Sequence, residues 1–173
     1  KLYDELRPTP ELSFAIRYYG TIAGINITAS HNPKEYNGYK VYWEDGAQLP
    51  PKEADVVAAE MDKLDFFHDI KTMDFEQAKA QGLIHMMDWQ TDEAYLKQVQ
   101  AVAINPDCVR QVADEFKLIY TPFHGAGYRL VPEILRRIGY KHILCVPEQM
   151  VIDGDFPTVK SPNPENKEGF NLA

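Results

Sequence analysis

Strand patterns and helix patterns alternate along the whole chain, and this alternation restricts the fold more than any other feature of the sequence. Short runs rich in β-branched and aromatic residues predict strands at residues 24–28, 38–43, 117–121 and 142–146. Between these runs, apolar residues recur at helical spacing. Regular alternation of strands and helices favours an α/β protein.

Local signals mark the ends of several predicted helices. Thr9 followed by Pro10 is typical of an N-cap and a first-turn proline, and Gly20 is expected to end that helix. Asp74, with Gln77 three residues later, predicts a capping box. A helix after the paired prolines at 50 and 51 is expected to carry one apolar side, formed by Ala54, Val57, Met61 and Leu64.

The later part of the chain shows a second set of signals. A helical segment is expected from Thr91 to Asp114, with a restart at Asn105 and Pro106. A strand, a glycine-containing loop at 122–127, a helix and another strand should follow. We therefore expect two domains, with a boundary near residues 90–105. Both ends look truncated, because residue 1 starts almost directly on a strand pattern and residue 173 falls where a helix pattern begins.

Composition excludes several classes of protein. The 173 residues are 45% hydrophobic and 25% charged, which is typical of globular proteins and not of disordered ones. Eighteen basic residues against 26 acidic ones give a net charge of −8, which argues against a nucleic-acid partner. No apolar run approaches the roughly 18 residues of a membrane span, so no membrane partner is expected. Cys108 and Cys145 lie far apart, which suggests reduced thiols in a cytoplasmic protein.

One polar loop stands out as a candidate site. Ser30 and His31 follow a predicted strand and precede Asn32 and Pro33. The serine could be a nucleophile activated by a base, or it could accept a phosphoryl group. It could also be purely structural, because Ser30 and Asn32 are residue types that cap turns through side-chain hydrogen bonds. Chemistry alone favours the turn, since adjacent residues seldom form a nucleophile–base pair.

The same loop resembles a known family. The sequence TASHNP at residues 28–33, followed by YNGYK at 36–40, is similar to the active-site serine loop of the α-D-phosphohexomutases, the phosphoglucomutase/phosphomannomutase family. Further matches are RPTP at 7–10, GAQ at 46–48 and TPFHGAG at 121–127. A subgroup with bacterial phosphoglucomutases and phosphopentomutase-like mutases is indicated by VPEQ at 146–149, DFPTV at 155–159 and PNPE at 162–165.

The resemblance implies a fold and a domain organisation. The fold would consist of two mixed-sheet α/β/α domains, both incomplete in this chain. Residues 1–92 would be the C-terminal part of family domain 1, with the serine loop. Residues 93–173 would be most of domain 2, ending before the metal loop. Domains 3 and 4, which carry the sugar-recognition and phosphate-binding loops, would belong to the same polypeptide.

The resemblance also implies an activity and its residues. The full-length enzyme would interconvert a sugar 1-phosphate and 6-phosphate, with glucose as the expected sugar, through a phosphoserine and a sugar bisphosphate intermediate. Ser30 would carry the phosphoryl group, His31 would belong to its catalytic surround, and Lys40 would act as general acid and base at the reacting hydroxyl. Mg²⁺ would bind through the phosphate on Ser30, with no other cofactor-binding residue in the chain. The isolated piece is expected to be inactive.

Several alternatives and look-alike motifs remain. Phosphopentomutase or phosphomannomutase activity, or a catalytically silent binding module, would fit the same scaffold, whereas a serine hydrolase is disfavoured because no G-x-S-x-G elbow surrounds Ser30. Asp153 and Asp155 do not complete the family's D-x-D-x-D-R metal motif, and a turn is expected there. The glycines after His124 are interpreted as a structural βα turn.

Overall fold

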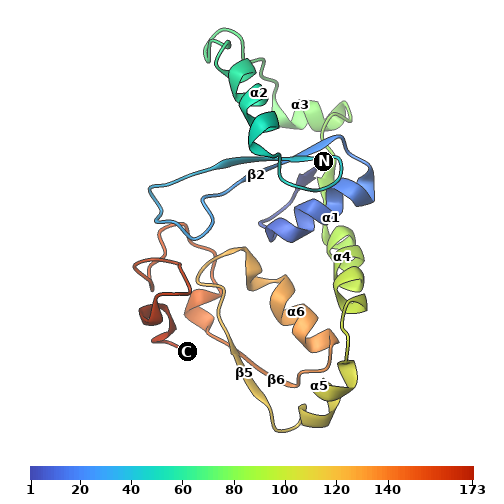
Figure 1. Ribbon diagram of the computed structural model, residues 1–173, viewed down its shortest axis with the longest axis vertical. Helices are drawn as coiled ribbons and strands as arrows, with labels where there is room; N and C mark the ends of the chain where they lie inside the picture. The colour runs from blue at the N-terminus through green and yellow to red at the C-terminus, as the bar shows by residue number, and fades with distance from the viewer.

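The computed structural model covers residues 1–173 and has α/β architecture, as the alternating patterns predict (Figure 1). Its strands form three separate two-stranded sheets: β1 pairs with β4, β2 with β3, and β5 with β6. The β1–β4 and β5–β6 pairs are parallel, and β2–β3 is antiparallel. The strands are β1 Leu2–Tyr3, β2 Ala23–Ile27, β3 Tyr39–Trp43, β4 Met86–Met87, β5 Lys117–Tyr120 and β6 His142–Cys145.

Six α-helices and three short 3₁₀ turns complete the fold. None of the helices combines the length and the apolar character that crossing a bilayer requires. The α-helices are α1 Thr9–Tyr19, α2 Pro51–Met61, α3 Phe75–Ala80, α4 Trp89–Ala101, α5 Pro106–Val112 and α6 Leu130–Arg137, and the 3₁₀ turns are η1 Ala126–Tyr128, η2 Pro147–Gln149 and η3 Lys167–Phe170.

Helix α1 packs on β2 and positions that strand. Ala15 and Ile16 are buried on the helix side that faces the strand. A Cβ on Gly24 would lie 2.5 Å from Ile16 Cδ1, so any larger residue there would force the buried Ile16 side chain to shift. Gly20 ends the helix in the left-handed conformation with φ 62°, as predicted.

The N-terminus of α1 differs from the prediction. Pro8 is the N-cap and Thr9 is already the first helical residue, so the Thr9 side chain does not cap the helix. Its Oγ1 instead accepts a hydrogen bond of 2.7 Å from Asn26 Nδ2 on β2. The hydroxyl therefore ties the helix to the neighbouring strand, a contact that a local cap pattern cannot reveal.

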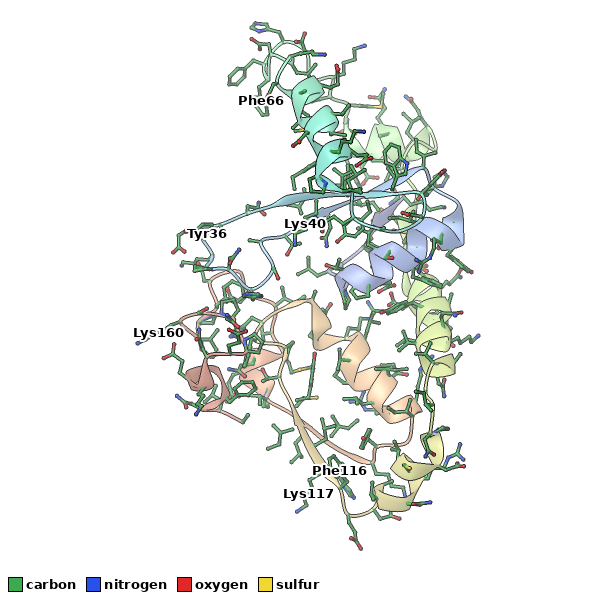
Figure 2. The ribbon with its side chains drawn as sticks, in the orientation of Figure 1. Tyr36, Lys40, Phe66, Phe116, Lys117 and Lys160 are labelled. Carbon is green, nitrogen blue, oxygen red and sulfur yellow. The ribbon has the colours of Figure 1, made fainter.

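Helices α2 and α3 project from one end of the molecule (Figure 1). The expected apolar side of α2 is not buried, and Leu64 lies beyond the end of the helix and is exposed. Figure 2 shows Phe66 at the far end of this projection. Asp74 does cap α3, since its Oδ1 accepts a 2.9 Å bond from the Gln77 amide, as the capping pattern predicts.

Helix α4 connects the two halves of the molecule and contacts both α1 and α6 (Figure 1). It begins at Trp89, with Asp88 as its capping residue, rather than at Thr91. Thr91 is instead buried in the contact with α1, where its Oγ1 lies 2.7 Å from the Tyr19 hydroxyl. The predicted restart is confirmed, because α5 begins at Pro106.

Candidate active site

The predicted serine lies in the loop that connects β2 to β3. At the base of this loop the Thr28 amide donates a 2.9 Å hydrogen bond to the Gly38 carbonyl. A Cβ on Gly38 would lie 2.5 Å from the Thr28 carbonyl oxygen, so only glycine allows the two chain segments to approach this closely. This close approach explains why the YNGYK motif has glycine at position 38.

Ser30 has a left-handed backbone conformation, with φ 61°. This conformation is uncommon for residues other than glycine and costs about 1–2 kcal/mol. Its amide donates a 3.0 Å hydrogen bond to Thr28 Oγ1, and the Asn32 amide donates one to the Ala29 carbonyl. A strained serine held on an exposed loop is the kind of outlier that often marks a functional residue.

The side chains of Ser30 and His31 lie next to each other on the surface. Ser30 Oγ and His31 Nδ1 are 3.3 Å apart, and the tautomer of the ring decides which atom donates. Neither Ser30 Oγ nor the Asn32 side chain caps the turn. The capping hydrogen bond is accepted by Thr28 Oγ1, from the Ser30 amide. The serine hydroxyl forms no hydrogen bond to the backbone of the turn, which weakens the purely structural interpretation.

Lys40 lies on β3, directly opposite Asn26 on β2. Alternation along β3 puts its side chain on the same face as the buried Tyr42. The side chain of Lys40 is half-buried, and no hydrogen bond or ion pair joins it to Ser30 or His31. Figure 2 shows Tyr36 near the outer end of the loop, with Lys40 nearer to α1 and α2.

A turn near the C-terminus contacts the serine loop. Lys34 Nζ donates a 2.8 Å hydrogen bond to Asp155 Oδ1, across 121 residues of sequence. This bond raises the pKa of Lys34 and lowers the pKa of Asp155. The turn predicted at Asp153 is confirmed, because its Oδ1 accepts a bond from the Asp155 amide and its carbonyl accepts one from Phe156.

His124 holds this turn from inside the molecule. The ring is buried, with Nδ1 at 2.8 Å from the Val151 carbonyl and Nε2 at 2.8 Å from Thr158 Oγ1. The carbonyl can only accept, so Nδ1 carries the proton and Thr158 donates to Nε2 in the neutral ring. The His124 side chain therefore binds both ends of the segment that contains Asp155. The sequence-based interpretation of the loop at 122–127 did not include this role.

Mg²⁺ is the metal that the family resemblance implies. No group of three or more His, Cys, Asp or Glu residues in the structure is arranged to hold a metal ion. The carboxylate that approaches the serine loop, Asp155, is already bound to Lys34. Dedicated magnesium sites combine carboxylates with phosphate oxygens. The residues of this chain therefore do not form a magnesium site by themselves.

A hollow formed by the N-terminal residues and β2 does not coincide with the serine loop. Its volume is about 980 Å³, and its walls include residues 1–8 and residues 23–27. Ser30, His31 and Lys40 are not among the residues that line it. Residues of both β1 and β2 line the hollow, and these strands belong to different two-stranded sheets.

Comparisons with known proteins agree with this fold and this loop. The family descriptions "Phosphoglucomutase/phosphomannomutase, alpha/beta/alpha domain I" and "domain II" match residues 1–68 and 93–173. The fold and the serine loop therefore define a protein built from two α/β/α mutase-type domains. The chain belongs to the phosphoglucomutase/phosphomannomutase family.

Individual relatives lead to the same family. A phosphoglucomutase from Staphylococcus epidermidis is 40% identical over 99% of this chain and 30% of its own length. A Haemophilus influenzae protein described as a phosphomannomutase is 34% identical over 96% of this chain and 32% of its own length. A solved structure from Thermus thermophilus, also described as a phosphomannomutase, shares the fold with a TM-score of 0.74 at 23% identity, over 99% of this chain and 35% of that chain. This chain thus spans about a third of the length of these proteins.

Proposed function

We propose that the full-length polypeptide is a phosphohexomutase that interconverts a sugar 1-phosphate and 6-phosphate, with glucose as the expected sugar. The observation that carries this proposal is the strained, exposed Ser30, whose hydroxyl has no capping role in the turn and lies beside His31. The family assignment and the relatives named phosphoglucomutase support the same activity. Ser30 would be carried as a phosphoserine.

The proposed reaction has two phosphoryl transfers. In the first, the bond between Ser30 Oγ and phosphorus breaks while a sugar hydroxyl forms a new bond to the same phosphorus. The hydroxyl loses its proton and Ser30 Oγ gains one, so that a sugar bisphosphate and a free serine result. In the second transfer, Ser30 Oγ loses its proton and bonds to the other phosphorus of the bisphosphate, while the bond from that phosphorus to the sugar oxygen breaks and the sugar oxygen gains a proton. Positioning and charge neutralisation account for most of the catalysis in such transfers.

The neighbouring side chains have separate proposed roles. His31 Nδ1 lies 3.3 Å from Ser30 Oγ, close enough to move a proton at that oxygen. Lys40 would handle the proton of the sugar hydroxyl, since it is free of other partners on the adjoining strand. The ion pair between Lys34 and Asp155 would hold the loop against the C-terminal half of the chain.

Other components must come from outside this chain. An oxygen of the Ser30 phosphate is the one ligand that these residues would offer to Mg²⁺. We propose that domains 3 and 4 of the same polypeptide bind the rest of the sugar phosphate, that residues 1–92 and 93–173 are the two domains present, and that the enzyme is cytoplasmic. The 173-residue piece alone would then not turn over sugar phosphates, because correct positioning can supply about 7–11 kcal/mol of barrier reduction.

The test uses Ser30→Ala in the full-length polypeptide. We expect turnover of glucose 1-phosphate to be lost and the mass of a phosphoryl adduct to disappear from the peptide containing residue 30. The substitution of an exposed hydroxyl should change stability by no more than about 0.5 kcal/mol. Ser161→Ala is the matched control, since SPNP at 161–164 repeats part of the loop pattern. Near wild-type turnover by Ser30→Ala would exclude the phosphoserine mechanism.

The same preparation tests the alternatives. The relative described as a phosphomannomutase keeps mannose phosphate as a second candidate substrate. Ribose 1-phosphate tests phosphopentomutase activity, and the ratio of kcat/KM among the three sugars decides between them. A full-length protein without a phosphoryl adduct and without turnover on any of them would indicate a silent binding module.

A further inference from the structure

Four charged side chains gather where α1 meets α4 and the segment before α6. Arg7 precedes α1, Glu11 lies in its first turn, Asp92 lies in the first turn of α4, and Arg129 precedes α6. The side chains of Arg7, Glu11 and Asp92 are only 1%, 0% and 5% exposed. This buried charge cluster joins the α1 end of the molecule to the elements that follow α4.

The two buried carboxyl groups have unequal partners. Asp92 accepts two hydrogen bonds from Arg7, from Nε at 2.6 Å and from Nη2 at 3.1 Å, and Arg129 Nε lies 3.5 Å from it. Neither oxygen of Glu11 accepts a hydrogen bond, and Arg7 Nε is 4.0 Å away. An ionised carboxylate buried without donors is strongly disfavoured. The negative charge therefore belongs on Asp92 rather than on Glu11.

Both arginines also bind other carboxylates, so their charges compensate Glu11 only in part. Arg7 Nη2 also binds Asp4 at 3.0 Å, and Arg129 Nη1 binds Glu5 at 3.1 Å. The two guanidinium groups thus form ion pairs with three carboxylates other than that of Glu11. The remaining titratable groups that face Glu11 are two tyrosine hydroxyls whose pKa values burial raises, so both stay neutral, namely Tyr3 of β1 and Tyr95 of α4.

We propose that Glu11 is a neutral carboxylic acid at physiological pH and donates its proton in a hydrogen bond to Asp92, so that one proton fastens α1 to α4. With that proton present, one group donates and the other accepts. Without it, two carboxylates face each other in a site that excludes water. Loss of the proton above neutral pH therefore loosens the junction between the two helices.

The titration of Glu11 agrees with this geometry. Burial, the charge of Asp92 and the hydrogen bond shared with Asp92 raise the pKa of Glu11 from 4.5 to about 8. The folded chain then keeps a proton that the unfolded chain releases. The contribution of Glu11 to stability is fully present below pH about 4.5 and is lost progressively as pH rises through about 8. This shared proton is independent of the proposed enzymatic activity.

The first test compares the full-length wild type with Glu11→Gln, a neutral side chain of the same shape. Thermal unfolding is measured from pH 5 to pH 9. We expect the Tm of the wild type to fall relative to that of Glu11→Gln by at least about 4 °C across this range, since each kcal/mol moves Tm by about 2–8 °C. The matched control is Glu115→Gln, at an exposed glutamate without a side-chain partner, which should follow the wild type. Parallel curves for the wild type and Glu11→Gln would overturn the proposal.

A second test detects the proton directly. The infrared difference spectrum between the wild type and Glu11→Gln at pH 7 should contain the carbonyl stretch of a protonated carboxylic acid, and the band should vanish in the wild type above pH 9. Hydrogen exchange of the α1 and α4 amides, corrected for its intrinsic pH dependence, should rise over the same interval only in the wild type. A difference spectrum with only a carboxylate band at pH 7 would show that Glu11 is ionised and would refute the proposal.

Discussion

The substitution Gly38→Ala tests whether the narrow base of the serine loop positions Ser30. The new Cβ would lie 2.5 Å from the Thr28 carbonyl oxygen, whereas ordinary contacts of this kind begin near 3.4 Å. The two segments must therefore separate by nearly 1 Å, or the loop must rotate. The hydrogen bond between the Thr28 amide and the Gly38 carbonyl would weaken or break, at a cost of about 1 kcal/mol.

The effect on catalysis should be much larger than the effect on stability. A misplacement of about 1 Å can cost about 10²-fold in rate, because phosphoryl transfer depends on alignment. We expect kcat/KM for glucose 1-phosphate to fall about 100-fold in the full-length polypeptide, while denaturant unfolding shows a loss of only about 1 kcal/mol. Gly154→Ala is the control, since a Cβ there meets nothing within 4 Å. An active Gly38→Ala enzyme would show that the base of the loop does not position the serine.

Two further substitutions test the side chains around the loop. Lys40→Met keeps the apolar stem and removes the ammonium, so kcat should fall by about 10²–10⁴-fold if Lys40 moves the proton, whereas a change confined to KM would make it a binding residue. Asp155→Asn should lower kcat/KM by no more than about fivefold, because exposed ion pairs are weak, and high salt should abolish the difference from the wild type. A loss of about 100-fold or more in Asp155→Asn would instead assign this carboxylate to the metal or the substrate.

The predicted elements agree with the structure where the deciding interactions are local. Gly20 ends α1, the Asp74 side chain caps α3, and Pro106 begins α5, because each of these signals acts within one helical turn. Strands β2 and β3 were predictable for the same reason, since a short run of β-branched and aromatic residues is a property of neighbouring positions.

The errors in the prediction come from contacts between distant segments. Thr9 has the sequence of an N-cap, yet Asn26 on β2 takes its hydroxyl. Leu64 fits the apolar spacing of α2, yet no element covers that side. Spacing along one chain predicts which residues could share a face, but it carries no information on what lies opposite that face.

The serine loop illustrates the same division. Its motif was recognisable, but Thr28 as the cap and the positive φ of Ser30 were not, because serine has no strong preference for the left-handed region. The contacts of Arg7 with Asp92 and of Lys34 with Asp155 span 85 and 121 residues. A single sequence contains no signal for pairings at such separations.

Two charge contacts connect the first part of the chain to later segments, and they differ in strength. The ion pair between Lys34 and Asp155 is exposed, with side chains 50% and 79% accessible, so water and salt screen it. The contact of Arg7 with Asp92 is buried, and removing one partner of such a pair typically costs about 3–5 kcal/mol. Helix α1 follows Arg7 and leads directly into β2 and Ser30. The buried contact of Arg7 with Asp92 therefore holds the start of α1 more firmly than the exposed pair holds the serine loop.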